Sequence, residues 1–280
     1  MGGAIMLFDS HSHFNHTDLT DEERAELFSI VDEAVKAGTM SYAMDIGFDL
    51  GSSAMAAEHA AAHDWCYAVV GCHPHDTKDM DDMQLALLKG LAAKPKVQAI
   101  GEIGLDFHYD LSDRDVQREW FRRQIRLANE LRMPICIHSR EADQECMDIL
   151  KEEGAFSEER KSRFPKRPDG TEDARVLLHC FSGSAELAKQ YVKLGATLSI
   201  CGPVTYKNNR KTIAVVEAVP IEYLLVETDS PFLTPVPMRG KRNLPVYVEY
   251  TAKKIAEIKG ISFEDVARIT CENAKRFYNI

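Results

Sequence analysis

Short apolar runs recur along the chain, and each is followed by a longer segment of helical character. The runs are rich in valine, isoleucine, leucine and cysteine and do not alternate strictly with polar residues, which is typical of parallel strands covered on both faces. Eight strands are therefore expected, at Ile5–Ser10, Tyr42–Ile46, Cys66–Cys72, Val97–Glu102, Ile135–His138, Val176–Cys180, Thr197–Cys201 and Tyr223–Glu227.

The segments between the runs carry residues that begin and end helices. Thr20 and Glu23 have the spacing of a capping box before an apolar series, and Gly38 is expected to stop that helix. Three later helices are expected to start after capping serines, at Ser112, Ser184 and Ser262.

Eight strand–helix alternations without a break in composition predict an α/β fold, a single (β/α)8 TIM barrel of eight parallel strands with outer helices over residues 1–280. The main alternative is a doubly wound open sheet. That fold usually carries a glycine-rich phosphate loop after its first strand, where this chain has His-Ser-His-Phe.

One stretch, residues 151–175, is polar and lacks periodicity, and it leads into the sixth expected strand. In a barrel such a connection lies on the amino-terminal face, away from the usual active site. We expect a solvated insertion there, with docking of a partner as the alternative.

Composition narrows the class of protein. The formal net charge of −10 argues against non-specific nucleic-acid binding over the whole surface, but it leaves a local basic patch open. No apolar stretch approaches the roughly 20 residues of a membrane span, and the pattern of a signal peptide is missing. The seven cysteines include no Cys-x-x-Cys pair, so we expect reduced, buried thiols in a cytoplasmic protein. The oligomeric state is left open, and a monomer is compatible with the sequence.

Side chains able to bind metals gather where the expected strands end. His11 and His13 follow the first strand and, being two residues apart, point to the same face. The carboxyl ends of the strands are where barrel enzymes hold their active sites. The candidate donors at later strand ends are Glu102, His138, His179 and Asp229.

Four imidazoles and two carboxylates are enough to hold two divalent cations, which suits hydrolysis of a phosphodiester, amide or ester. Glu102 is able to bridge the cations with its two oxygens, and Asp229 is able to bind one of them and to accept a proton from the attacking water. Histidines favour Zn²⁺, Mn²⁺ or Ni²⁺, whereas carboxylates and phosphate favour Mg²⁺ or Mn²⁺.

Other residues on the same face are candidates for contact with a phosphate-bearing substrate, because cations concentrated there stand out in an acidic chain. They are His73, Arg140, Tyr206, Lys207, Arg239 and Lys241. Five aromatic side chains in these loops are candidates for stacking on bases, namely Phe107, Tyr109, Phe181, Tyr206 and Phe232. Three acids share the inward parity of the donors and are expected to orient them, namely Asp9, Asp106 and Glu227.

Seven short motifs occur in order along nearly the whole chain: Asp9-Ser-His-Ser-His13, Gly71-Cys-His-Pro-His75, Ile100-Gly-Glu-Ile-Gly-Leu-Asp106, Ile137-His-Ser-Arg140, His179-Cys-Phe-Ser-Gly183, Glu227-Thr-Asp-Ser-Pro231 and Arg239-Gly-Lys-Arg-Asn243. Together they resemble the TatD family of metal-dependent deoxyribonucleases in the amidohydrolase-like superfamily. The resemblance implies one metal held by His11, His13, Glu102 and Asp229, and a second held by Glu102, His138 and His179. It also implies Mg²⁺ as a working ion and 3′-5′ exonuclease-type hydrolysis of DNA.

Three functions are therefore weighed. The leading hypothesis is a two-metal phosphodiesterase acting on DNA, as single strands or from 3′ ends. The alternative is a metal-dependent amidohydrolase or esterase acting on a small molecule; related barrels often bridge their metals with a carboxylated lysine on strand four, and no lysine lies within residues 97–106. A non-enzymatic metal-binding regulator is disfavoured by the complete donor set.

Overall fold

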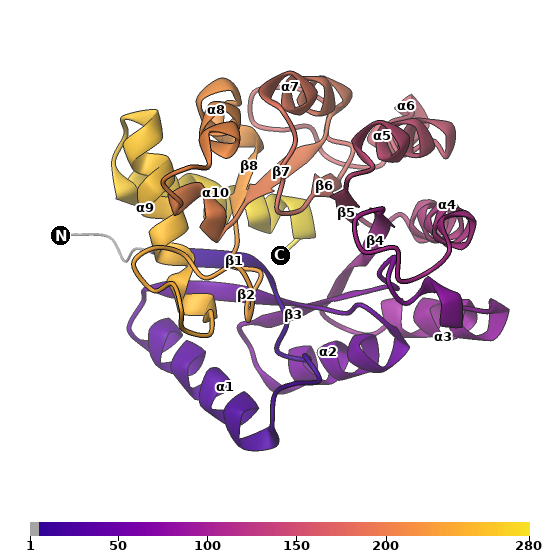
Figure 1. The fold of residues 1–280 in the computed structure, drawn as a ribbon, viewed down its shortest axis with the longest axis horizontal. Helices are drawn as coiled ribbons and strands as arrows, with labels where there is room; N and C mark the ends of the chain where they lie inside the picture. The colour runs from indigo at the N-terminus through magenta and orange to yellow at the C-terminus, as the bar shows by residue number, and fades with distance from the viewer. Residues whose placement is uncertain (1–5) are drawn as a thin grey trace.

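Eight parallel strands form one sheet in the computed structural model, which describes residues 6–280, so that Ile5 lies outside it. Neighbours in the sheet follow chain order, and the sheet curls into a barrel, as predicted (Figure 1). Every expected run overlaps one strand, although β1, β2, β4 and β5 extend beyond the expected ranges. The strands are β1 (Leu7–Ser12), β2 (Met40–Ile46), β3 (Cys66–Val70), β4 (Val97–Asp106), β5 (Ile135–Arg140), β6 (Val176–Leu178), β7 (Thr197–Ile200) and β8 (Leu224–Val226).

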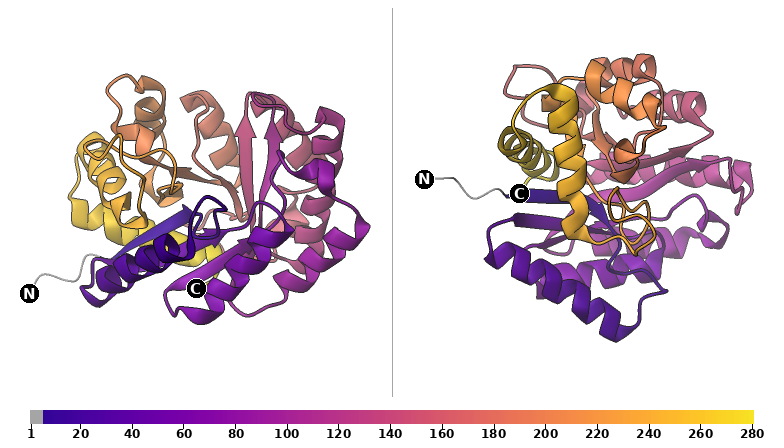
Figure 2. Two further views of the ribbon diagram at one scale, coloured as in Figure 1. Left: turned by 60° about the horizontal axis from the view of Figure 1, so that its bottom comes forward. Right: turned by 60° about the vertical axis from the view of Figure 1, so that its left-hand side comes forward.

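Helices surround the barrel on the outside (Figures 1 and 2). They are α1 (Asp21–Lys36), α2 (Leu50–Ala62), α3 (Asp82–Ala92), α4 (Arg114–Leu131), α5 (Asp143–Glu152), α6 (Glu158–Lys161), α7 (Ala185–Leu194), α8 (Arg210–Ala218), α9 (Val248–Lys259) and α10 (Phe263–Tyr278). The described part of the chain also holds the short 3-10 helices η1 (Thr77–Asp79), η2 (Gly202–Thr205), η3 (Ile221–Tyr223) and η4 (Pro245–Tyr247). Within residues 6–280, no helix combines the length and the apolarity needed to cross a membrane.

The predicted helix caps are correct with one exception. Thr20 and Glu23 form the capping box of α1, and Ser184 and Ser262 cap α7 and α10. Helix α4 is instead capped by Asp113, whose carboxylate accepts from the Asp115 N–H at 2.8 Å. The neighbouring serine, Ser112, donates its hydroxyl to the His75 carbonyl at 2.7 Å, so it ties the start of α4 to the loop after β3.

The inside of the barrel is filled by apolar side chains from the strands and is closed at its amino-terminal end by α10. Phe8, Met44 and Val69 belong to one buried cluster with Phe277 and Tyr278 of that helix. The Tyr278 hydroxyl donates to the Ser10 carbonyl at 3.0 Å, which links the helix to β1. The opposite, carboxyl-terminal end is the face on which the polar strand ends meet.

The barrel closes between β8 and β1 through the residues that follow the two strands. The His13 N–H donates to the Ser230 carbonyl at 2.8 Å, and the Asp229 N–H donates to the His11 carbonyl at 2.9 Å. Ser12 and Ser230 form an isolated parallel bridge at the same point. We call this junction the seam, and it runs directly beneath the candidate donors.

The expectation of a solvated insertion at residues 151–175 is wrong for three of its four arginines. Arg160, Arg167 and Arg175 are each only 2% exposed. Arg160 donates to the Met133 carbonyl at 2.9 Å, and Arg167 donates to the Gly195 carbonyl at 2.9 Å. A guanidinium has five N–H donors in a fixed fork, so one side chain is able to satisfy several carbonyls that the strand ends leave open.

Candidate metal centre

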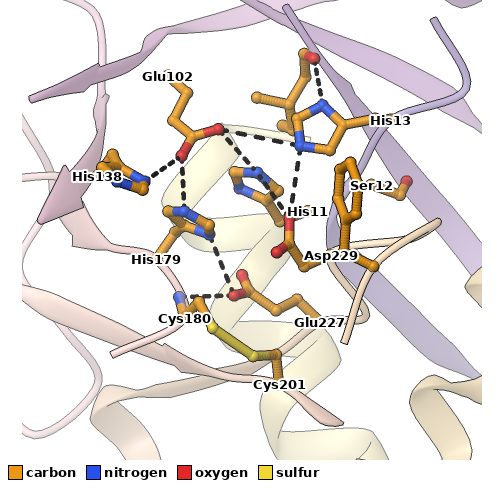
Figure 3. Close-up of polar contacts among 12 residues, drawn as sticks. His11, Ser12, His13, Glu102, His138, His179, Cys180, Cys201, Glu227 and Asp229 are labelled. Atoms are coloured by element: carbon orange, nitrogen blue, oxygen red, sulfur yellow. Dashed lines mark hydrogen bonds and ion pairs between the residues drawn. A yellow bond between two sulfur atoms is a disulfide. The ribbon is translucent and has the colours of Figure 1, made fainter. Parts of the chain in front are cut away.

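Side chains that lie in or just after β1, β4, β5, β6 and β8 meet at the carboxyl-terminal face, with Glu102 in the middle (Figure 3). Its Oε1 lies 2.7 Å from His179 Nε2 and 2.9 Å from His138 Nδ1. Its Oε2 lies 3.4 Å from His11 Nε2 and 3.9 Å from His13 Nε2. The two oxygens of one carboxylate therefore face two different pairs of imidazoles.

Asp229 completes the group on the His11 side. Its Oδ1 lies 3.4 Å from His13 Nε2 and 3.7 Å from His11 Nε2. These distances put two imidazoles and two carboxylates around one point, although Asp229 and His11 lie far apart in the sequence. The seam brings them together, because both follow strands that meet there.

The ring orientations fit a bound divalent cation. The His13 Nδ1 lies 2.8 Å from the Ile46 carbonyl and donates to it, which leaves the Nε2 lone pair facing Glu102. The His11 Nε2 faces the same way, is fully buried and has no hydrogen-bond partner among the described residues. A buried imidazole nitrogen without a partner is costly unless a ligand occupies its lone pair. The donor set therefore suits a metal rather than a purely structural network.

His73 lies closer to the donors than the sequence suggested. Ligand atoms of His73, Glu102 and His138 lie within 4.8 Å of one another, as do those of His11, His13 and Glu102. The sequence predicted substrate contact for His73, because the donors expected for the two metals were already complete without it. Its position makes His73 a further candidate donor on the His138 side.

Asp106 holds His138 from the side opposite to Glu102. The Asp106 Oδ2 lies 3.0 Å from His138 Nε2 and 2.9 Å from His75 Nε2. This arrangement requires β4 and β5 to approach closely at Gly104, whose φ is +152°. A Cβ at that position would lie 1.9 Å from the His138 carbonyl oxygen, so only glycine fits.

The other two supporting acids contact different groups. Asp9 accepts from the Thr228 N–H at 2.8 Å and from its hydroxyl at 2.6 Å, so it fastens β1 to the end of β8 rather than orienting an imidazole. Glu227 lies 3.4 Å from His179 Nδ1 through its Oε1, and the same oxygen accepts from the Cys180 N–H at 2.6 Å. Both carboxylates are fully buried.

The electrostatics keep the two central carboxylates ionised. Burial alone would raise the pKa of Glu102, but His179 and His73 outweigh it and hold that pKa well below its usual range. Burial also acts to raise the pKa of Asp229, and the hydrogen bond to His13 with the neighbouring imidazoles lowers it instead. Both side chains are therefore available as anionic donors at neutral pH.

Cations and aromatic rings lie in pairs on the loops around this centre. The Arg140 guanidinium lies over the Tyr109 ring at 4.7 Å, and that of Arg239 lies over the Tyr206 ring at 4.4 Å. The Tyr206 hydroxyl donates to a backbone carbonyl at 3.0 Å. The two lysines proposed for substrate contact, Lys207 and Lys241, are exposed.

The five aromatic candidates differ in exposure. Phe181 is buried, and Phe107 lies under the Arg114 guanidinium. Phe232 is 47% exposed, and its ring centroid lies 6.4 Å from that of His13. A residue that the sequence analysis missed, His16, packs edge-on against Phe232 at 5.0 Å. The spacing of His16 five residues after His11 offered no strand parity by which to find it.

The expectation that all cysteines are reduced is wrong for two of them. Cys180 follows β6 and Cys201 follows β7, and the two are joined by a disulfide beside Glu227 (Figure 3). The remaining five cysteines are free and buried. Neighbouring strands end at nearly the same height in a barrel, which is the feature that brings these two residues together.

Comparisons with known proteins cover nearly the whole chain. A family described as TatD related DNase matches residues 8–279. The chain is 45% identical over 275 residues to the uncharacterized metal-dependent hydrolase YabD of Bacillus subtilis, covering 98% of this chain and 100% of that protein. It is 35% identical to the uncharacterized metal-dependent hydrolase TatD of Mycobacterium tuberculosis, covering 98% of each. The crystal structure of YjjV, a TatD homologue from Escherichia coli, shares the fold with a TM-score of 0.83 at 24% identity, covering 99% of each chain.

Proposed function

The chain belongs to the TatD related DNase family of metal-dependent hydrolases, and from this membership and the donor set we propose that it hydrolyses phosphodiester bonds of DNA, removing nucleotides from a 3′ end with two divalent cations. We propose Mg²⁺ or Mn²⁺ as the working ions, with Zn²⁺ or Ni²⁺ able to occupy the same donors. A cytoplasmic location stays a prediction from the sequence.

One observation carries the proposal: Glu102 turns one oxygen toward His11 and the other toward His138 and His179. A carboxylate so placed suits two cations held close together. Such a pair, when bound, supplies Lewis-acid activation of water and neutralises charge on a phosphate. No lysine lies on β4 to replace this carboxylate, which favours the glutamate-bridged chemistry over that of the carboxylated-lysine barrels.

In the proposed reaction some residues bind the cations, one residue orients a histidine, and one carboxylate accepts a proton. The donors around Glu102 form a cage for the cations. One side of this cage consists of His11, His13 and Asp229, and the other side consists of His138 and His179. Asp229 stays ionised and is less buried than the imidazoles around it, so its carboxylate is the group proposed to accept the proton of the attacking water. Glu227 Oε1 lies 3.4 Å from His179 Nδ1, and this ion-pair contact is proposed to help keep the His179 Nε2 turned inward.

Substrate contacts are proposed for the loops around the cage. Arg140 and Arg239 offer planar donors for the phosphates of a strand, each already stacked on a tyrosine. His73 lies close enough to the cage to serve as a donor or to contact the scissile phosphate. Lys207 and Lys241 add exposed positive charge. Basic and aromatic groups interleaved in this way are typical of single-stranded nucleic-acid binding.

The test uses the full chain, an end-labelled single-stranded oligonucleotide and a panel of Mg²⁺, Mn²⁺, Zn²⁺ and Ni²⁺. Glu102→Gln and Asp229→Asn are expected to lower nucleotide release at least about a thousandfold, because each removes a charge that the reaction requires. Glu119→Gln, on the exposed face of α4, is the matched control and is expected to act like the wild type. Equal nucleotide release by the wild type and all three variants would contradict the proposal.

Product analysis in the same experiment separates the alternatives. Mononucleotides released from the 3′ end are the expected outcome, while internal fragments would contradict the exonuclease polarity. A parallel panel of dihydropyrimidine and lactone substrates tests the small-molecule alternative. Turnover of that panel with none of DNA would replace the proposed substrate and leave the metal site intact.

A further inference from the structure

We propose that Cys180 and Cys201 form a thiol–disulfide exchange site for small-molecule disulfides, and that the state of this pair sets how firmly Glu227 holds His179. Cys180 directly follows His179, and Cys201 directly follows β7, the neighbouring strand in the sheet. Their sulfurs and a Glu227 oxygen lie within 4.8 Å of one another. The proposed hydrolysis uses neither sulfur.

The route from the sulfur pair to the metal centre is short and consists of direct contacts. The Cys180 N–H donates to Glu227 Oε1 at 2.6 Å, and that oxygen lies 3.4 Å from His179 Nδ1. His179 Nε2 in turn lies 2.7 Å from Glu102. Cys180 has a φ of +43°, a conformation that a side chain rarely adopts unless its surroundings hold it. A link to Cys201 is one such restraint on the peptide that orients Glu227.

The two cysteines differ in exposure, which assigns their order of reaction. Cys180 is half-buried, whereas Cys201 is 4% exposed. The Cys180 thiol therefore loses its proton and attacks one sulfur of a small disulfide such as oxidised glutathione, releasing one glutathione thiol. The Cys201 thiol then loses its proton and attacks the Cys180 sulfur, which forms the internal disulfide and releases the second glutathione. Two protein thiols are oxidised, and one small disulfide is reduced to two thiols.

The consequence for the centre follows from the contacts. With the link formed, the Cys180 peptide is fixed, and Glu227 keeps both the hydrogen bond from the Cys180 N–H and its 3.4 Å ion-pair contact with His179 Nδ1. With the link reduced, one restraint on that peptide is lost, and the His179 ring is less firmly oriented. Groups that orient metal-binding histidines typically change metal affinity about 10- to 100-fold. In a reducing compartment the pair is expected to be transient, as most cytosolic disulfides are.

The experiment compares one wild-type preparation in two states, so it needs no variant to fold. The protein is reduced with a phosphine and desalted, and half of it is then oxidised with oxidised glutathione. Thiols counted in denaturant are expected to fall from seven to five, with Cys180 joined to Cys201 in peptide mass spectra. Mn²⁺ affinity, measured from the electron paramagnetic resonance of the free ion, is expected to be about tenfold tighter in the oxidised half.

Two variants test whether the effect depends on this cysteine pair. Cys201→Ser is expected to keep the lower affinity under both treatments and to accumulate glutathione on Cys180. Cys271→Ser removes a buried cysteine of α10 and is expected to respond like the wild type. Seven thiols after oxidation, or equal Mn²⁺ affinity in a confirmed disulfide and its reduced form, would overturn the proposal. Failure of both states to bind Mn²⁺ would instead count against the proposed metal centre.

Discussion

Asp229 and His11 are joined both through their backbones and at their side chains. The Asp229 N–H donates to the His11 carbonyl at 2.9 Å, and its Oδ1 lies 3.7 Å from the His11 Nε2. The first contact belongs to the seam and the second to the candidate metal centre. Because the same two residues take part in both contacts, the positions of the metal donors depend on closure of the barrel at the seam.

Replacing His11 and His13 together with alanine is expected to remove one of the two proposed ions and leave the other. The remaining donors, Glu102, His138 and His179, keep their mutual contacts of 2.7 and 2.9 Å. Mn²⁺ bound at equilibrium, measured by elemental analysis, reports the loss directly. His108→Ala, an exposed imidazole paired with Glu141, is the control. Unchanged metal content in the double variant would contradict the assignment.

Phe232→Ala is expected to lower kcat/KM for a DNA strand whose terminal nucleotide carries a base. Stacking on an aromatic ring is worth about 1–3 kcal/mol per base, so kcat/KM is expected to fall about fivefold or more. A strand ending in an abasic nucleotide has nothing to stack and is expected to lose little. Met83→Ala, an exposed apolar side chain on α3, serves as the control. An equal loss on both substrates would assign Phe232 to packing.

Arg239→Gln is expected to reduce the salt dependence of DNA binding. For a single strand, each neutralised phosphate contributes a slope of about −0.7 in log affinity against log salt, so the variant is expected to be shallower by about that amount. Fluorescence anisotropy with a labelled oligonucleotide in EDTA measures the slope. Arg268→Gln, on the exposed face of α10, is expected to leave it unchanged. Weaker binding with an unaltered slope would mean that Arg239 contacts no phosphate.

Asp76→Asn is expected to stabilise the fold above pH 6 and to have little effect near pH 4. Burial, and then the nearby Asp49, raise the pKa of Asp76 from 3.8 to about 6. Because the folded pKa exceeds the unfolded one, stability falls as pH rises from about 4 through 6, and asparagine avoids that cost. The gain in unfolding free energy is about 1 kcal/mol at pH 8, reduced from the full shift because the side chain is half-buried.

Urea unfolding at pH 8 and pH 4.5, in EDTA, measures this difference. Glu58→Gln, which removes an exposed carboxylate on α2, is the control at both pH values. A variant that is less stable than the wild type at pH 8 would show that the Asp76 carboxylate makes a favourable contact that outweighs its burial.

Much of the fold and of the candidate centre follows from local rules in the sequence. Strand parity places His11 and His13 on one face, and capping chemistry locates the start of α1 at Thr20. Both rules act over a few residues, which is why they are readable without a structure. The strand-end rule then collects Glu102 and Asp229 at the same face once a barrel is assumed.

The features that sequence reasoning missed depend on contacts between distant segments. The sequence around Arg160 indicates a solvated charge, but in the structure Arg160 is buried and donates to the Met133 carbonyl. Ser112 precedes α4 with suitable chemistry for a cap, yet the His75 carbonyl takes its hydroxyl. Cys201 pairs with a cysteine only because β6 and β7 are neighbours in the sheet. Each outcome is decided by packing rather than by spacing along the chain.

The seam has a consequence for when catalytic chemistry first becomes available to a newly made chain. Its hydrogen bonds include that from the Thr228 N–H to Asp9, across 219 residues of sequence. Loops of this length close slowly, and contacts between such distant segments are expected late in folding. A partly folded or truncated chain without the seam has His11 and Asp229 apart. On the proposed function, the capacity to cut DNA therefore arrives together with the finished fold, and an incomplete chain is expected to leave nucleic acid intact.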